Sequence, residues 1–220
     1  MPATQFHTQL LDACRRLAGK GFFNGSADSI SLRIPGSGGM VLASGLTDWR
    51  PVPFSDIKAV QFSTQGECAG LHAMIYEERT DVGAVTVSSP KGVRMLAQSG
   101  GRLPPIFDEQ VRHIGASVDA LNRGESESRD LVKILRQRTN AVLLGEQLLC
   151  LGTTCERALC NTELYEKCAL AYVIARASGG RVGTIPFWVR WIANHRLMRD
   201  ERQAAVSYRQ GQVPEGVSGY

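Results

Sequence analysis

The chain has 220 residues, of which 43% are hydrophobic and 21% are charged, and these fractions are typical of a soluble globular protein. This length suits one domain with a sizeable core and at most a small appendage. Lys and Arg number 25 against 21 Asp and Glu, and the net charge of +4 is too small to indicate a nucleic-acid partner. No apolar run approaches the roughly 20 residues that cross a bilayer, so we expect no membrane segment.

The N-terminal segment lacks the basic region, the apolar stretch and the small-residue cleavage site of a secretory signal. We therefore expect a cytoplasmic protein, in a reducing compartment where thiols stay free. The six cysteines form no C-x-x-C pair, so the chain has neither zinc-ribbon nor thioredoxin spacing. We interpret them as small buried or half-buried side chains.

The first half of the chain contains both helical and strand patterns. Apolar residues recur at helical spacing over residues 6–18, which predicts an amphipathic helix. Residues 29–34 alternate and predict a strand, which a glycine-rich turn connects to a return strand over 40–43. A second helix is predicted over 70–79, and a buried β-branched strand over 82–87.

The middle of the chain begins with a helix that we expect to be capped by Ser89 and to run from Pro90 to about Gln98. Residues 99–128 predict irregular structure, because glycine, proline and polar residues are frequent there. The pattern then predicts one more helix, over residues 131–138.

Two strands joined by a tight turn, over 141–144 and 148–151, precede the clearest helix. Thr153 and Glu156 have the spacing of a capping box, and the helical period continues to about Ala177. Helices and strands are mixed throughout, so the composition of elements favours an α/β or α+β class with helices on a central sheet.

The last forty residues are rich in arginine and contain Trp188 and Trp191. We treat residues 181–220 as a basic C-terminal extension to a domain of residues 1–180, packing on that domain or on a neighbouring subunit. A nucleic-acid contact is the least favoured interpretation of this segment. It would show an affinity that falls steeply with salt.

Several segments in order resemble the class II aldolase/adducin family, which includes fuculose-phosphate and rhamnulose-phosphate aldolases and ribulose-phosphate 4-epimerases. They are 25–33 (GSADSISLR), 41–46 (VLASGL) and 71–85 (LHAMIYEERTDVGAV), followed by paired strands and a closing helix over 141–177. The resemblance covers residues 5–178. It implies a three-layer α/β/α class II aldolase-like fold with a central, largely antiparallel sheet.

The family's chemistry uses a divalent metal, usually zinc, held by an H-x-H pair and a third histidine; the metal polarises the substrate carbonyl. The resemblance places these ligand positions on Val87, Ser89 and Glu146. Valine has no donor atom, serine is a poor zinc ligand, and a single carboxylate does not hold zinc. The sequence therefore predicts a degenerate metal site and no cofactor, with a divalent metal such as zinc as the alternative.

The family's catalytic glutamate falls on Cys68, beside Glu67, without the P-S-S-E segment that surrounds it in the family. The paired serines that complete the family's phosphate site fall on Gly66 and Glu67, where a carboxylate would repel a phosphate dianion. The resemblance assigns ligand binding to backbone and hydroxyl groups of Gly25, Ser26, Ser44 and Gly45. We therefore expect a small sugar-like or phosphorylated ligand, with its phosphate contacts only half kept.

Other side chains could carry rebuilt chemistry, and the candidates are Glu67, Cys68 and His113. We expect His113 in a loop, from which it could reach a cleft. Cys68 would need a nearby base or cation to act as a nucleophile. His72 lies on a predicted helix without a spaced partner, so we interpret it as structural.

Two functions stay open. The first is a pseudoenzyme of the class II aldolase/adducin family, non-catalytic and serving in ligand binding or oligomer formation. The second is an aldehyde-lyase or epimerase with a rebuilt active site, acting on a sugar phosphate or hydroxy-carbonyl substrate. In either case the resemblance implies a homo-oligomer, a tetramer in the family, and four apolar residues near the C-terminus need burial: Phe187, Trp188, Trp191 and Ile192.

Overall fold

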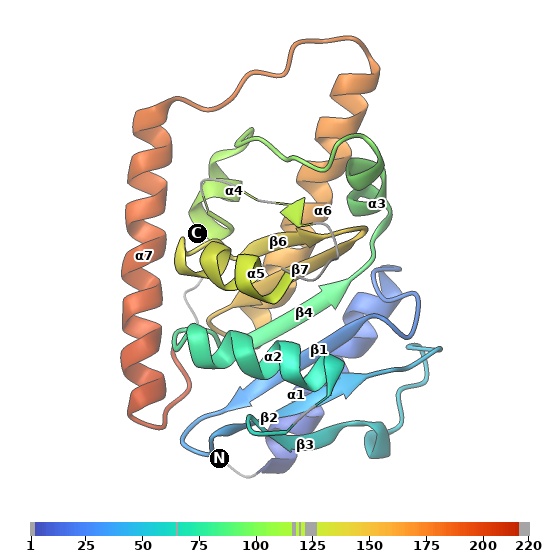
Figure 1. Cartoon of the computed structure of the whole chain (residues 1–220), viewed down its shortest axis with the longest axis vertical. Coiled ribbons are helices and arrows are strands. Elements are labelled where there is room, and N and C mark those ends of the chain that lie inside the picture. Colours follow the sequence, from blue (N-terminus) through green and yellow to red (C-terminus); the bar gives the residue numbers. More distant parts are fainter. Residues whose placement is uncertain (1–2, 65, 116–117, 119, 122–126, 216–220) are drawn as a thin grey trace.

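A seven-stranded sheet forms the centre of the computed structural model, which describes residues 3–64, 66–115, 118, 120–121 and 127–215 (Figure 1). The spatial order is β3-β2-β1-β4-β7-β6-β5. The strands are β1 (Ser29–Ile34), β2 (Gly39–Ser44), β3 (Lys58–Gln61), β4 (Ala84–Ser88), β5 (Ala120–Leu121), β6 (Ala141–Leu144) and β7 (Gln147–Gly152). Among these strands every neighbouring pair is antiparallel except β5 and β6, which confirms the expected largely antiparallel sheet.

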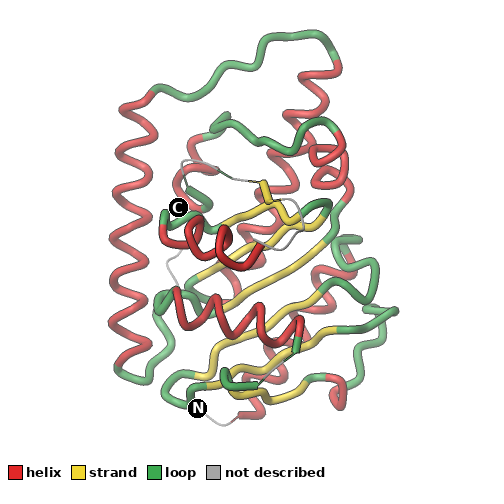
Figure 2. The backbone as a smooth tube through the Cα atoms, viewed as in Figure 1, coloured by secondary structure: helices red, strands yellow, loops and turns green. Residues whose placement is uncertain are grey.

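Helices cover both faces of the sheet, which confirms the three-layer α/β/α fold (Figures 1 and 2). Helices α2 and α5 lie on one face, and α1, α3 and α6 lie on the other. The helices are α1 (Ala3–Gly19), α2 (Glu67–Glu78), α3 (Lys91–Gln98), α4 (Asp108–His113), α5 (Glu127–Arg136), α6 (Cys155–Ala177) and α7 (Phe187–Arg209), with a short 3₁₀ helix η1 (Phe54–Asp56). Within the described residues, no helix combines the length and the apolar character needed to span a membrane.

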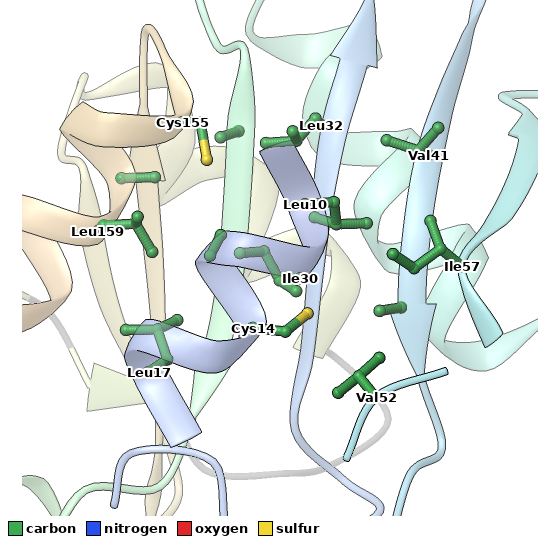
Figure 3. Close-up of a cluster of buried hydrophobic side chains, with 14 of the residues drawn as sticks. Leu10, Cys14, Leu17, Ile30, Leu32, Val41, Val52, Ile57, Cys155 and Leu159 are labelled. Carbon is green, nitrogen blue, oxygen red and sulfur yellow. The ribbon is translucent and has the colours of Figure 1, made fainter. Parts of the chain in front are cut away.

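The alternation of β1 divides its side chains between the two layers of helices. Leu10 and Leu17 of α1 are fully buried against Ile30, on one face of the strand (Figure 3). Residues two apart on a strand share a face, so Ser29 and Ser31 point to the opposite side, under α2. The strand therefore presents an apolar face to α1 and hydroxyl groups to α2.

The second face of the sheet is closed by a separate apolar cluster. Ile75 of α2 and Leu135 of α5 are fully buried there, over Val85, Val142 and Leu149 of the central strands. Both faces of β4, β6 and β7 are buried, which explains why hydrophobic residues predominate in their sequences. This burial fixes the position of α2, which forms one wall of the candidate site.

Helix α3 begins differently from the prediction. The residue at its N-cap is Pro90, which makes no side-chain cap, and the Ser89 hydroxyl is bonded elsewhere. The carboxylate of Glu166 on α6 instead accepts hydrogen bonds from the backbone N–H groups of Gly92 (2.7 Å) and Val93 (3.0 Å). A carboxylate at this position satisfies the free N–H groups of the first turn and opposes the helix dipole.

The capping residue of α6 is Thr154, one position later than predicted. Its side chain accepts a hydrogen bond from the Arg157 N–H at 3.2 Å, whereas the Thr153 carbonyl accepts from the Tyr208 hydroxyl at 2.7 Å. The physical reason is the close packing of Gly152 on the first turn of α6. That contact sets where the chain turns from strand to helix.

The expectation of irregular structure over 99–128 is wrong in part, because α4 lies within it and β5 and the start of α5 also fall inside. His113 is consequently the last residue of a helix and not part of a loop. The buried Gln110 side chain organises this region, since it accepts from the Ile106 N–H and donates to the Pro104 carbonyl. Residues 116–117, 119 and 122–126 lie outside the described part of the chain.

Within the last forty residues, for which the sequence predicted no secondary structure, Phe187–Arg209 form the 23-residue helix α7, packed on α4 at the side of the molecule (Figure 1). Its Glu201 side chain is completely buried and accepts hydrogen bonds from Arg79 (3.1 Å) and Asn140 (3.0 Å). Arg79 also forms a bidentate pair with Asp81 (2.7 and 2.9 Å). These buried bonds attach α7 to the sheet.

Candidate active-site cavity

A cavity of about 680 Å³ opens between α2, α5 and the loop that precedes β1. Its polar lining comes from Ser26, Ser29, Glu67, Cys68 and Gln147. Its apolar lining comes from Leu71, Met74, Val87, Leu131 and Leu144. The structure thus brings four of the candidate residues together at one site: Ser26, Glu67, Cys68 and Val87.

The remaining candidates do not belong to the described lining of this cavity. Gly25, Ser44, Gly45, Ser89 and Glu146 lie outside it. The Glu146 carboxylate accepts a hydrogen bond from the Gln98 amide at 3.3 Å, on an exposed surface near the end of α3. The ligand-binding and metal positions implied by resemblance are therefore split between the cavity and its surroundings.

His113 lies outside the described cavity lining, with its Nδ1 accepting a hydrogen bond from Arg157 at 2.8 Å. Burial, and then the charges of Arg157 and Arg112, lower the pKa of His113 to about 4. His113 therefore serves the contact between α4 and α6, because its neutral ring accepts a hydrogen bond from Arg157 of α6. The proposed reach of His113 into the cleft finds no support in this arrangement.

The loop before β1 is held from inside by a buried carboxylate. Asp28 Oδ2 accepts hydrogen bonds from the backbone N–H groups of Asn24 (2.5 Å) and Gly25 (2.9 Å), and Oδ1 accepts from the Ser89 hydroxyl (2.8 Å). Gln147 donates to the Ala27 carbonyl at 3.0 Å and fastens the loop to β7. The N–H groups at the start of this loop are consequently satisfied by the chain's own anion.

A connected set of hydrogen-bonding side chains lies under the cavity, between β1 and α2. Ser29 Oγ is 2.9 Å from His72 Nε2, Ser31 Oγ is 2.6 Å from His72 Nδ1, and Ser31 Oγ is 2.8 Å from the Tyr76 hydroxyl. All four side chains are buried. Burial lowers the pKa of His72 to about 3, so the imidazole is neutral at physiological pH.

The described lining of the cavity carries one acidic side chain and no basic one. It contains the Glu67 carboxylate and no lysine, arginine or histidine side chain. A phosphate dianion binds most strongly where arginine, lysine or free backbone N–H groups converge. This cavity offers an acceptor at Glu67 and hydroxyl groups at Ser26 and Ser29, which suits an uncharged polar molecule.

The residues at the expected metal positions do not fit a zinc ion. Val87 lines the cavity but has no donor atom, the Ser89 hydroxyl donates to Asp28, and Glu146 binds Gln98 outside the cavity. Within the described part of the chain, no group of three or more His, Cys, Asp or Glu side chains is arranged to hold a metal. Zinc in proteins needs at least three such ligands.

Residues 8–173 match the family described as the class II aldolase and adducin N-terminal domain. The chain belongs to this family. The match covers all seven described strands and the helices on both faces of the sheet, and it ends within α6. Comparison with curated proteins gave no significant match.

Solved structures confirm that this class II aldolase family member has the family fold. The chain is similar to an L-fuculose 1-phosphate aldolase, with a TM-score of 0.78 and 19% identity over 90% of this chain and 98% of that one. For the L-fuculose-1-phosphate aldolase of Thermus thermophilus the TM-score is 0.68 and the identity is 18%, over 83% of this chain and 100% of that one. For the L-fuculose 1-phosphate aldolase of Glaciozyma antarctica the TM-score is 0.72 and the identity is 21%, over 94% of this chain and 87% of that one. Identities this low establish a common fold.

Sequence reasoning about this family member missed three side chains at the site. Ser29 and Gln147 line the cavity, and Asp28 holds the loop beside it. The alternation of Ser29 and Ser31 on one face of a strand, opposite an apolar face, was a readable signal for buried hydroxyl groups. For Gln147 and Asp28 the sequence contains no such signal, because their partners lie far along the chain or in the backbone.

Proposed function

We propose that this class II aldolase family member is a non-catalytic, ligand-binding protein whose cavity takes a small uncharged, hydroxylated compound such as a sugar. The observation that carries the proposal is the chemistry at the three metal positions. Val87 contributes a hydrocarbon wall, while Ser89 and Glu146 are engaged with other side chains. A Lewis acid that stabilises an enediolate has no ligand set at this place.

The argument for an uncharged ligand rests on the loop before β1. The N–H groups of Asn24 and Gly25 and the Ser89 hydroxyl all donate to the Asp28 carboxylate. A phosphate would have to compete with this internal anion for its donors, and Glu67 would repel it. The unphosphorylated member of any sugar and sugar-phosphate pair is therefore the better ligand.

A specific observation also supports the alternative function. Glu67 and Cys68, a carboxylate and a thiol, both line the cavity beside hydroxyl groups. Such a pair could serve an aldehyde-lyase or epimerase with a rebuilt active site, with Glu67 moving a proton of a hydroxy-carbonyl substrate. We rank this second because, among the described residues, the cavity lining holds no histidine or cationic side chain to activate the thiol or to stabilise a developing negative charge on the substrate.

Calorimetric titration of the purified full chain with a matched pair of compounds tests the binding proposal. L-fuculose and L-fuculose 1-phosphate differ only by the phosphate group, and the second is the compound for which the similar aldolases are named. We expect the uncharged sugar to bind at least as tightly as the phosphate ester. Tighter binding of the ester by tenfold or more, or no binding of either compound, would overturn the proposal.

Metal analysis and an activity assay separate the two functions. After dialysis against zinc and then against buffer, we expect far less than one zinc per chain and no cleavage of L-fuculose 1-phosphate. Retained stoichiometric metal would contradict a degenerate site. Turnover that disappears in Glu67→Gln or Cys68→Ser would establish the rebuilt enzyme instead, with Ser55→Ala on the distant η1 as the matched control.

We further propose that the protein is a homo-oligomer, a tetramer by analogy with its family, and that it resides in the cytoplasm. Support for assembly comes from large apolar side chains left exposed on α6 and α7: Ile174, Phe187, Trp188, Trp191 and Ile192. Support for the compartment comes from the cysteines, all six of which are free thiols. Nucleic acid and membrane are not among the proposed partners.

A further inference from the structure

Four side chains beneath the cavity form one unbroken hydrogen-bonded chain, which we name the buried relay. It runs from Tyr76 to Ser31, then to His72, and ends at Ser29. Three of its members are closed off from solvent, whereas Ser29 also lines the cavity. Because each hydroxyl has a single proton to donate, the direction of the relay can be worked out from its buried end.

The buried end fixes the first two donors. The Tyr76 hydroxyl has Ser31 as its only side-chain hydrogen-bond partner in the described structure, so its proton must be donated to Ser31 Oγ or be left unpaired. Ser31 then has His72 Nδ1 as the acceptor for its own proton, at 2.6 Å. Since an unpaired donor in a buried position loses its full hydration, this direction is the favoured one.

The direction of the Ser31 hydrogen bond determines which ring nitrogen of His72 carries the proton. Burial keeps His72 neutral, so only one of its ring nitrogens carries a proton. Nδ1 accepts from Ser31, and the proton is therefore on Nε2, which donates to Ser29 Oγ at 2.9 Å. The reverse direction would leave the Tyr76 proton unpaired in the core, and a mixed one would leave the Ser31 proton unpaired.

The consequence appears at the surface of the cavity. Ser29 Oγ accepts from His72, so its own proton is not used by the relay. Ser29 is 1% exposed and lines the cavity, which leaves the cavity as the place where this proton finds an acceptor. Glu67, in the same lining, offers the opposite character, since a carboxylate only accepts.

We propose that the buried relay makes Ser29 a fixed hydrogen-bond donor on the floor of the cavity, and that the cavity thereby selects an uncharged hydroxy-carbonyl compound. The carbonyl oxygen of such a ligand accepts from Ser29, and one of its hydroxyl groups donates to Glu67. This inference depends on the proposed function only for the identity of the ligand. The orientation of Ser29 is a property of the protein by itself.

Nitrogen NMR of the histidine rings tests the orientation without any ligand. In the ¹⁵N-labelled full chain, protonated and unprotonated ring nitrogens have clearly different shifts and couplings to the ring protons. His72 is assigned as the signal that persists in His7→Gln, His113→Gln and His195→Gln. We expect a proton on Nε2 and none on Nδ1; a proton on Nδ1 would overturn the proposal, because Ser29 would then donate to the histidine.

Titration with L-fuculose tests the selection. Ser29→Ala removes one neutral hydrogen bond, so we expect its affinity to be weaker by about 3- to 10-fold. Ser207→Ala on α7, outside both the relay and the described cavity lining, should bind within about twofold of the unchanged protein. This comparison separates a contact made by Ser29 from the general effect of losing a serine hydroxyl, while the ring-nitrogen experiment tests the direction of the relay.

The outcomes keep the two proposals apart. If the unchanged protein binds L-fuculose and Ser29→Ala binds it equally well, the role of Ser29 is refuted and the proposed function stands. If the unchanged protein prefers the phosphate ester or binds neither compound, the proposed function fails. The ring-nitrogen result then still decides whether Ser29 donates into the cavity.

Discussion

Gly152 lies where the end of β7 meets the first turn of α6, and the space around it leaves no room for a side chain. A Cβ atom there would be 2.2 Å from the backbone nitrogen of Ala158 and 2.7 Å from its Cα. Backbone atoms of a helix cannot move aside independently, so a larger residue must displace α6 from the sheet.

We predict that Gly152→Ala lowers the free energy of unfolding by about 3 kcal/mol, at the upper end of overpacking effects. Urea unfolding followed by circular dichroism measures the change. Gly19→Ala is the matched control, because no atom lies within 4 Å of its Cβ and it should be close to neutral. Equal stability of the two variants would show that α6 tolerates a shift at this contact.

His72 makes the stability of the protein depend on pH. Burial lowers its pKa to about 3, well below the value of about 6.5 in the unfolded chain. The unfolded state therefore binds more protons below pH 6.5, and stability decreases as the pH falls from about 6.5 toward 3. Above pH 6.5 both states hold a neutral imidazole, and this residue contributes no further dependence.

We predict that the free energy of unfolding falls by up to about 1.4 kcal/mol for each pH unit below 6 through His72 alone. Urea unfolding at pH 7, 6 and 5 measures it, and the proton NMR signal of the His72 ring should not shift over the same range. A stability that stays constant from pH 7 to pH 5, or a ring that titrates near pH 6.5, would contradict the buried relay as drawn.

Helix α7 combines a narrow apolar stripe with one buried charge. Ala193, Leu197, Ala204 and Tyr208 are buried along one side, and Glu201 lies among them, completely buried. Its carboxylate is satisfied by Arg79 and Asn140, and by Arg138 at 3.3 Å. A buried charge with this many partners orients the helix, because any other rotation would leave charges unpaired.

We predict that Glu201→Ala destabilises the protein by about 3 kcal/mol or more, because Arg79 and Asn140 would lose a buried partner. Thermal or urea unfolding measures the loss, and hydrogen exchange should show α7 opening first. The neighbouring Arg202→Ala is the control, since Arg202 is exposed and such changes usually stay within about 0.5 kcal/mol. Similar stabilities for the two variants would mean that α7 is held by its apolar contacts alone.

Large apolar side chains are exposed on the surface of the molecule at the beginning of α7. Trp188 and Trp191 are 65% and 62% exposed, and Phe187 is 72% exposed. Apolar patches of this kind mark interaction surfaces, and the homo-oligomer that we propose would place a second copy of the chain on this one. These residues belong to the segment 181–220, whose arginine and tryptophan content the sequence analysis did not explain.

We predict a mass by light scattering of at least twice the 24.0 kDa of a single chain. The double variant Trp188→Ala, Trp191→Ala should lower that mass toward the single chain while leaving the circular dichroism spectrum unchanged, because both side chains lie outside the core. Val206→Ala, also on the exposed side of α7, serves as the control. A single-chain mass for the unchanged protein would refute assembly through this surface.

Much of the fold was predictable because its signals are local. The alternation over 29–34, the apolar runs over 82–87 and 141–151, and the helical period after Thr153 each depend on a few neighbouring residues, and all correspond to observed elements. The predictions were wrong where the local structure depends on partners that are distant in the sequence or that no periodic pattern shows. Ser89 lost its capping role to Glu166, and Gln110 organises α4 through contacts that no local pattern displays.

The sequence by itself determined the family, the layered fold and the residue types at the metal positions, since a valine lacks donor atoms in any conformation. Only the tertiary structure decided which side chains share the cavity and which way their hydrogen bonds run. Asp28 occupies the N–H groups of its own loop, and Tyr76 orients Ser29 through two intervening residues. The bonds between β1 and α2 join residues that are 41 or more positions apart, and a hydrogen bond forms only within a narrow range of distances, which exists only once the chain is folded.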